Sequence, residues 1–465
     1  LDFISLTVFV FPAEICLTLT VLAVIIRKEG LILRYPKFSH KEILQRLSNI
    51  PFFHFVKWTV LSIPVGIIAG GIGTLFHYLY SIAENSRLAH PWLVYFLPIA
   101  GVVIALLYHY FGKDKDISTN TVIHAIHTDD KIPKATAPLI VIATLLTHLC
   151  GGSAGREGAA LQLGGSLSDT FLSPFQKKLH ISSSDRHIII MCGMAATFCA
   201  LFGTPVTAVI FSLELATIGA MYYAALVPCT ISSLIGYLIS NFFGFKASVY
   251  SVNFASINLV PILQTVALGA MCALVSILFL LIMRIMTKFF KKYIKNTCLR
   301  AFVGGVIIII LTLLVGSTKY NGAGMSIVAS AMRGETEFYD FLLKILFTAV
   351  TLASGFKGGE IVPSFFAGAT LGCSVGLLLG MDPSFAAALG LLGVFCGVTN
   401  CPLASIVLGI ELFGSQGILF YSIVCAVSYM LSGYSGLYSE QSILYSKYSA
   451  TGFVKKPRKK RIFNL

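Results

Sequence analysis

Long apolar stretches alternate along the chain with short segments that carry charges, glycine and proline. A membrane span needs about 20 mostly apolar residues. Stretches that meet this requirement are 56–80, 93–111, 221–243, 262–286, 301–316 and 416–432. Glycine, proline or isolated charges interrupt others, at 137–149, 188–218, 341–354, 361–380 and 385–413, as in helices that end inside a membrane protein. The pattern predicts an all-α polytopic membrane protein with broken helices.

Composition and charge agree with this class. Only 12% of the 465 residues are charged, against about 25% in average soluble proteins. The net charge of +14 is clustered at 27–46, 284–300 and 455–461. The positive-inside rule places these segments, and so the C-terminus, in the cytoplasm, and we expect no nucleic-acid partner. The eleven cysteines form no CxxC pair and are expected to be small core residues.

The ends of the chain differ from its centre. Residues 1–27 could form an extra apolar span, since its charges follow the apolar run, the wrong order for a signal peptide. Residues 28–49 are expected to be a basic cytoplasmic segment, and 446–465 a basic cytoplasmic tail. The transport core is predicted to cover 50–445.

The core repeats itself. Residues 198–214 (FCALFGTPVTAVIFSLE) and 395–411 (FCGVTNCPLASIVLGIE) share Phe-Cys, a proline six residues later and a final glutamate, without a gap. We therefore divide the core into halves at about 50–245 and 262–445. A duplicated membrane unit is typical of transporters, whose substrate sites form where broken helices of both halves meet. The repeated glutamates, Glu214 and Glu411, are expected to be structural.

A glycine-rich segment at 151–165 contains Arg156 and Glu157 between apolar stretches. Ionisable residues at membrane depth are costly and usually mark an ion or proton pathway. Glycines allow non-helical backbone, whose N–H groups can bind an anion. The segment lacks the Gly-Lys-Ser/Thr ending of a nucleotide-binding loop. Helix packing remains an alternative for Gly158, Gly164 and Gly165.

Three other polar places interrupt apolar sequence: the run 116–121, the glycine-rich run 355–363 with Lys357 and Glu360, and Gly436-Leu437-Tyr438. Each has an ordinary explanation, respectively a helix cap, a helix start and an interfacial tyrosine. Each could also supply hydroxyl or N–H groups to an anion.

Taken together, these motifs carry a family resemblance. Gly155-Arg156-Glu157-Gly158 resembles the G-R-E-G signature of the CLC chloride channel and transporter family, and 351–372 is similar to its second anion-binding helix start. The resemblance covers about 50–445. It implies a CLC-like homodimer with one pathway per subunit, as a multi-pass protein of the bacterial inner or plasma membrane, in contact with lipid.

Within that family, the chain resembles the bacterial fluoride/proton antiporter branch. Chloride-type members carry G-S-G-I-P at 117–121, G-I-F-x-P at the Glu360-Ile361-Val362-Pro363 run, and often a second glutamate after Glu214. This chain has none of these. It also departs from the fluoride branch at 118–120, where Gly-Met-Asn is usual, and near Val362. A chloride-selective channel and a chloride/proton exchanger therefore stay open as alternatives.

The resemblance also implies roles for residues. Glu157 would be the gate, competing with the anion when ionised and carrying a proton when neutral. Glu360 is either a second proton station or a helix cap. Arg156 either contacts the anion or, as we favour, pairs with a carboxylate in the scaffold. The expected anion-binding residues are Ser118, Thr119, Asn120, Gly155, Arg156, Gly158, Ile361, Val362 and Tyr438.

A membrane-embedded enzyme is the rival from another class. The chain offers no HExxH motif and no nucleophile elbow, so we expect no enzyme activity, cofactor or metal. His124 and His127 have the spacing of a metal pair, but we favour a solvated helix face for them.

Overall fold

The structure is a computed structural model that describes residues 51–112, 117–175, 182–245, 249–444 and 446–447. The predicted N-terminal span 1–27, the basic segment 28–49 and nearly all of the tail 446–465 lie outside the described residues. The chain divides into two compact units, Leu1–Lys57 and Trp58–Leu465. The second unit holds nearly all of the predicted transport core.

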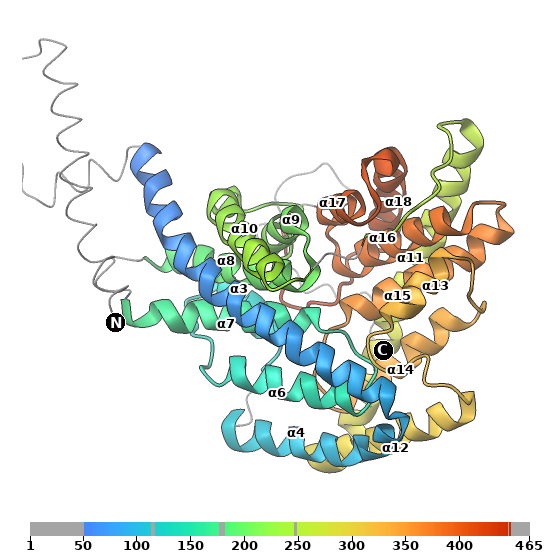
Figure 1. Cartoon of the computed structure of the whole chain (residues 1–465), viewed down its shortest axis with the longest axis horizontal. Helices are drawn as coiled ribbons and strands as arrows, with labels where there is room; N and C mark the ends of the chain where they lie inside the picture. The colour runs from blue at the N-terminus through green and yellow to red at the C-terminus, as the bar shows by residue number, and fades with distance from the viewer. Residues whose placement is uncertain (1–50, 113–116, 176–181, 246–248, 445, 448–465) are drawn as a thin grey trace, which may run out of the picture. The chain divides into compact units, whose positions relative to one another are not determined.

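The described residues are predominantly α-helical, as predicted. The first set of helices is α3 (Pro51–Ala89), α4 (Leu97–Gly112), α5 (Thr119–His127), α6 (Thr136–Leu149), α7 (Glu157–Leu172), α8 (Ser183–Phe202), α9 (Pro205–Glu214) and α10 (Leu226–Phe242). The second set is α11 (Leu259–Tyr293), α12 (Thr297–Val315), α13 (Met325–Met332), α14 (Asp340–Ala353), α15 (Ile361–Leu378), α16 (Pro383–Thr399), α17 (Pro402–Phe413) and α18 (Ile418–Leu431). Figure 1 shows the first set from blue to green and the second from yellow to red.

Short elements complete the described chain. One-turn 3-10 helices are η1 (Pro91–Phe96), η2 (Ser173–Phe175), η3 (Tyr223–Ala225) and η4 (Ser415–Gly417). Two-residue strands β1 (Thr217–Ile218) and β2 (Ser442–Ile443) pair in parallel, with Thr217 opposite Ser442. This pair fixes the segment after the last helix to the loop that follows α9 in the first half, which matters because that segment carries Tyr438.

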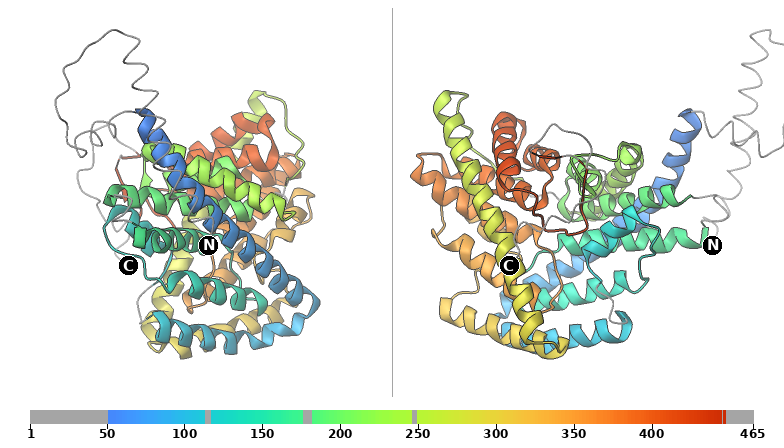
Figure 2. Two further views of the ribbon diagram at one scale, coloured as in Figure 1. Left: turned by 60° about the vertical axis from the view of Figure 1, so that its left-hand side comes forward. Right: turned by 180° about the vertical axis from the view of Figure 1, so that it is seen from behind.

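Seven helical segments among the described residues are long and apolar enough to cross a membrane. They include α8 and α15, which we expected to be interrupted, whereas the predicted span 416–432 is mostly the shorter helix α18. Helix α8 is almost entirely covered by protein. Apolar sequence therefore marks burial in protein as well as exposure to lipid. Seen from behind, the long helix α11 crosses the second half, where it packs on α14, α16 and α18 (Figure 2).

The two halves are oriented oppositely, which the sequence alone does not reveal. Helices α9 and α17 pack together between the halves (Figure 1). The Glu214 carboxylate, at the end of α9, accepts the N–H groups of Leu403 (3.2 Å) and Ala404 (2.9 Å) at the start of α17. Since each helix end lies beside the other's start, the pair is antiparallel.

The reverse contact completes the pair. Glu411 near the end of α17 accepts the N–H groups of Val206 (2.9 Å) and Thr207 (2.8 Å) at the start of α9. Each carboxylate thus satisfies N–H groups that have no partner within their own helix and meets the positive end of a helix dipole. The structural interpretation of both glutamates is confirmed, and the repeat is an inverted one.

Close helix packing follows the same symmetry. A Cβ at Gly164 of α7 would collide with the carbonyl oxygen of Gly193 on α8, and one at Gly368 of α15 with that of Gly390 on α16. Only glycine permits such contacts. The packing interpretation therefore holds for Gly164. These close contacts with α8 and α16 place the first halves of α7 and α15 inside the protein, away from lipid.

Replacing Glu214 by alanine should leave the N–H groups of Leu403 and Ala404 without their acceptor in a buried place. Unsatisfied buried groups of this kind cost about 1–3 kcal/mol, so we expect a lower Tm for the detergent-solubilised protein in a thermal melt. Glu214→Gln keeps one acceptor oxygen and should lose less. Glu335→Ala, at an exposed carboxylate, is the control. Equal Tm values for Glu214→Ala and Glu335→Ala would contradict the capping role.

Candidate functional site

The two glycine-rich segments meet at the centre of the repeat. Gly155 and Gly359 exchange two backbone hydrogen bonds of 2.7 Å each, forming an antiparallel bridge. Helix α7 begins two residues after Gly155, and α15 begins two residues after Gly359. The start of α5 joins them, since the hydroxyl of Thr119 donates to the carbonyl of Gly158 at 3.3 Å. Three helix starts from both halves therefore converge.

The convergence of three helix starts creates a region of positive electrostatic potential inside the protein. The first N–H groups of a helix have no partner in their own helix, and its dipole is positive at that end. Gly155 and Gly158 flank the start of α7, while Ile361 and Val362 begin α15. All four are buried. The structure thus brings together the predicted backbone donors of both halves, and such donors suit an anion.

Glu157 occupies this place. Its side chain is fully buried, and its Oε2 accepts the N–H of Val362 at 3.3 Å across the repeat. The other oxygen, Oε1, has no hydrogen-bond partner among the described residues. A side chain at Gly155 would collide with Oε2. The carboxylate therefore lies where an anion would receive the same backbone donors.

Arg156 points into the scaffold. Its Nε lies 3.9 Å from Oε1 of Glu157, longer than a hydrogen bond, and its Nη2 donates to the Leu201 carbonyl at 3.4 Å. The guanidinium also lies over the ring of Tyr80, 4.6 Å from its centroid. These contacts favour the scaffold role. The Arg156 charge still acts on Glu157 at short range.

Glu360 is the residue just before α15, half-buried, and close enough to Glu157 for their charges to interact. The Gly155–Gly359 bridge makes Glu360 the counterpart of Arg156, and Ile361 the counterpart of Glu157. The repeat thus places one carboxylate inside the convergence and a second beside it. Lys357, whose Nζ lies 4.4 Å from the centroid of the Tyr108 ring, adds a positive charge near Glu360.

The predicted cluster at the start of α5 divides by role. Ser118 is half-buried, and its N–H donates to the Thr121 hydroxyl at 3.2 Å. The Thr119 hydroxyl is already bonded within the protein, to Gly158. Asn120 Oδ1 accepts the N–H of Glu440 at 3.4 Å, so it holds the segment that follows the last helix. Ser118 is the N-cap of α5 and forms a capping box with Thr121, which is the ordinary explanation that the sequence offers for this run.

Tyr438 brings a phenol to the same region. It is 4% exposed, and its Oη has no hydrogen-bond partner among the described residues. Glu360 and Glu157 are both close enough for their charges to act on the phenol. A buried, unpartnered hydroxyl is costly unless something binds it. This favours a ligand over an interfacial anchor.

Gln162 is a site residue that sequence reasoning did not select. It lies on α7, five residues after Glu157, and is buried. Its Nε2 donates to the Thr119 hydroxyl at 3.0 Å, while its Oε1 has no partner among the described residues. The signal was present in the sequence, since Gln162 is an uncharged polar residue within an otherwise small and apolar helix segment.

The histidine pair on α5 lies on a solvent-accessible face, in agreement with the expectation: His127 is exposed, and the side chain of His124 is 44% exposed. His124 Nδ1 lies 3.2 Å from Glu440 Oε2, and its Nε2 lies 3.1 Å from Asp130 Oδ2. His127 Nε2 lies 2.9 Å from the Ala216 carbonyl oxygen. Their partners come from loops that the sequence does not place nearby. Within the described ranges, no group of three metal-ligating side chains occurs.

Comparisons with known proteins agree on one family. The family described as voltage gated chloride channels matches residues 100–433. A chloride/fluoride channel protein of Pseudomonas syringae pv. tomato is 35% identical over 412 residues, which cover 87% of this chain and 90% of that protein.

Solved structures give the same result. A crystal structure of a CLC-type fluoride/proton antiporter superposes with a TM-score of 0.79 at 30% identity, covering 88% of this chain and 100% of that one. A slow cyanobacterial Cl⁻/H⁺ antiporter shares the fold, with a TM-score of 0.69 at 19% identity over 81% of this chain and 94% of that one.

Replacing Tyr438 by phenylalanine should weaken anion affinity without lowering stability, because the phenol bonds no described protein group. One neutral hydrogen bond is worth about 1 kcal/mol, so the Kd for fluoride in calorimetric titration should rise about fivefold. Tyr421→Phe is the matched control: its buried Oη donates to the Gly414 carbonyl at 3.1 Å. That variant should lose stability and keep its affinity. Unchanged affinity in Tyr438→Phe would return Tyr438 to an anchoring role.

Proposed function

This chain belongs to the voltage-gated chloride channel family, also called CLC, and on that premise we propose that it exchanges fluoride for protons across a membrane. The observation that carries the proposal is the buried Glu157 carboxylate, held by the N–H of Val362 where three helix starts converge. A chloride-selective channel or chloride/proton exchanger is the alternative, because it would use the same site.

Coupling would follow from competition for one set of donors. The ionised carboxylate of Glu157 and a small anion both require the backbone N–H groups of α7 and α15. An anion that enters displaces the carboxylate from those donors. Buried away from them, the carboxylate is stabilised by taking up a proton. The neutral side chain then no longer competes, so a proton is bound as an anion takes its place.

Three features support fluoride as the anion. Fluoride is small and strongly hydrated, and a dense set of backbone donors can replace its water. The chain lacks the chloride-type G-S-G-I-P run at 117–121 and has Glu360 in place of an apolar residue. The relatives named above include a chloride/fluoride channel protein and a fluoride/proton antiporter. In this proposal Gly155, Gly158, Ile361 and Val362 bind through the backbone, Ser118 and Tyr438 through hydroxyls, and Thr119 through its N–H.

Glu360 would be the second proton station. A CLC-type exchanger often has a second glutamate after the position of Glu214, where this chain has the buried Leu215. Glu360 lies beside Glu157 and is half-buried, so its carboxylate could pass a proton to or from the Glu157 carboxylate. We retain a helix-capping role as the alternative for this residue.

The proposal extends to assembly and membrane. We propose a homodimer in the bacterial inner membrane, with one pathway per subunit and the C-terminus in the cytoplasm. The positive charges at 284–300, at the end of α11 and the start of α12, support this orientation through the positive-inside rule. The proposal assigns the chain no enzymatic activity and no nucleic-acid partner.

Proteoliposomes loaded with fluoride or with chloride test the function directly. With valinomycin and potassium compensating charge, fluoride efflux should raise the external pH, because protons enter as fluoride leaves. Chloride efflux should be slower by about tenfold or more, corresponding to ~1.4 kcal/mol of selectivity. Equal efflux of both ions would favour the chloride alternative. Fluoride efflux with no pH change would replace exchange by a channel.

Glu157→Gln tests the gate, since glutamine keeps the shape of glutamate and cannot carry the proton. We expect fluoride efflux to continue while the accompanying rise in external pH disappears. Glu335→Gln, which removes an exposed carboxylate, should leave both fluxes unchanged. Native proton flux in Glu157→Gln would move the coupling role to another carboxylate, with Glu360 the first to examine.

A further inference from the structure

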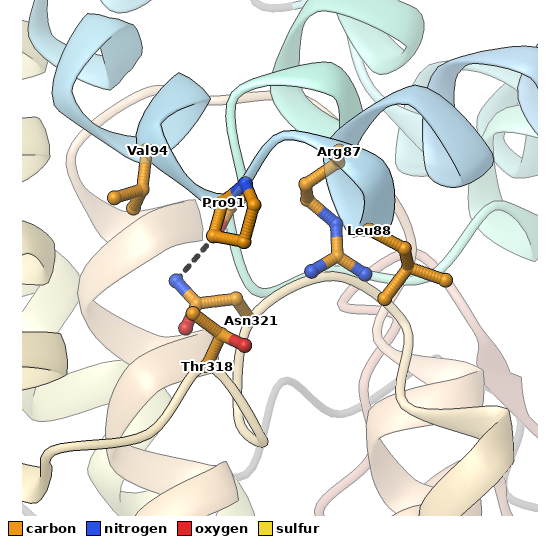
Figure 3. A pocket seen from close by; sticks show the side chains of 7 residues that line it. Arg87, Leu88, Pro91, Val94, Thr318 and Asn321 are labelled. Atoms are coloured by element: carbon orange, nitrogen blue, oxygen red, sulfur yellow. Dashed lines mark hydrogen bonds between the residues drawn. The ribbon is translucent and has the colours of Figure 1, made fainter.

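A second polar hollow lies outside the convergence of helix starts. Its cavity volume is about 30 Å³, and it is lined by Arg87 and Leu88 of α3, Pro91 and Val94 of η1, Gly151, Thr318 and Asn321. A volume of this size holds a particle as small as a water molecule or a simple ion. Figure 3 shows the Arg87 guanidinium directed into it, with Asn321 and Thr318 on the facing loop. Within the described part of the chain, its lining combines donor groups with apolar walls and includes no carboxylate.

Arg87 is buried without full compensation. The residue is 7% exposed, and its Nε has no hydrogen-bond partner among the described residues. The nearest carboxylate in an ion pair is that of Glu84, 3.9 Å from Nη2, beyond hydrogen-bond distance. Burying a guanidinium in this way is costly unless another negative charge approaches it.

A second buried cation adds to the positive charge. Lys344 of α14 is 0% exposed, and its Nζ donates to the carbonyl groups of Tyr320 (3.1 Å) and Gly322 (2.7 Å). Gly322 also lies against the Arg87 guanidinium, since a Cβ there would come within 2.8 Å of Nη2. The two cations therefore flank one residue.

Arg87 makes no close ion pair among the described residues. The carboxylate paired with it, that of Glu84, lies 3.9 Å from Nη2. The Asp340 carboxylate is already paired with Lys319, whose Nζ lies 2.6 Å from Oδ2. A small anion in the hollow would give the Arg87 guanidinium the close negative partner that it lacks.

We propose that this hollow binds one small monovalent inorganic anion at the guanidinium of Arg87, with the Thr318 hydroxyl at its mouth. Asn321 holds the wall in place, because its Nδ2 donates to the carbonyl of Gly151 (2.8 Å) and to the Thr312 hydroxyl (3.2 Å). This site is distinct from the Glu157 site and would exist whichever anion the protein transports.

The place of the hollow in the fold gives the site a use. Thr318 follows the end of α12, about 28 Å along that helix from the basic turn at its start. The hollow therefore lies toward the face opposite the basic turn. Gly151 in its wall begins the segment that reaches Glu157 six residues later. An anion bound here would lie on the side of the membrane opposite the basic turn between α11 and α12, next to the glycine-rich segment 151–165.

Crystals of the full chain soaked in bromide test this site, because bromide scatters anomalously. We expect an anomalous peak beside Arg87 in the native protein, its loss in Arg87→Gln, and its retention in Arg333→Gln, where an exposed arginine paired with Glu335 is removed. No native peak would overturn the proposal. A peak that persists at equal height in Arg87→Gln would identify an adventitious ion only.

Glu84→Gln keeps the test decisive if Arg87→Gln fails to fold. Removing this carboxylate takes away the negative charge that is paired with Arg87, so the bromide peak should reach half its full height at a concentration several-fold below the native one. A peak that needs the same or a higher bromide concentration would overturn the electrostatic basis of the site. Peaks at Glu157 in the same crystals report separately on the proposed transport site.

Discussion

Backbone N–H groups at a helix start need an acceptor, and inside a membrane protein the lipid supplies none. Three helices, α5, α7 and α15, begin at one place, so that many such N–H groups lie close together. Such a place favours an anionic group, because the donors and the positive ends of the helix dipoles act together. In the structure the Glu157 carboxylate lies there and accepts the N–H of Val362. The glycines, the broken helices and the apolar surroundings all serve to create and protect this place.

The inverted repeat explains how such a place can be stable. Each half alone would present a helix start with unpaired N–H groups and a carboxylate with no donors. In the pair α9 and α17, each of the two carboxylates, Glu214 and Glu411, accepts N–H groups at the start of the helix from the other half. At α7 and α15 the same symmetry brings two starts together but supplies one carboxylate, because Ile361 stands opposite Glu157. The symmetry is close enough to build the scaffold, and at Ile361 it supplies no second carboxylate to occupy the backbone donors.

Much of this could be predicted from local sequence. The Gly155-Arg156-Glu157-Gly158 run, the repeated Phe-Cys and proline pattern, and the apolar stretches are local signals, and they indicated the class, the duplication and the gate. What could not be predicted depends on contacts between distant segments. Gln162 is a site residue because it bonds the Thr119 hydroxyl. His124 contacts Glu440, which lies 316 residues later in the chain. The bridge between Gly155 and Gly359 is needed to show that Glu360 is the counterpart of Arg156 in the repeat. Apolar content likewise cannot tell α8, enclosed by protein, from a helix facing lipid.

The Gly155–Gly359 bridge also limits how access can alternate between the two sides. A transporter that rocks one repeat against the other must part the halves at its binding site. Here two hydrogen bonds of 2.7 Å join the halves beside that site, at a cost of about 0.5–1.5 kcal/mol each if broken. Turning the Glu157 side chain breaks one bond of 3.3 Å. In the proposed function the cheaper motion is therefore a rotamer change of Glu157. The membrane need not then reshape around moving domains, and turnover should be insensitive to bilayer thickness.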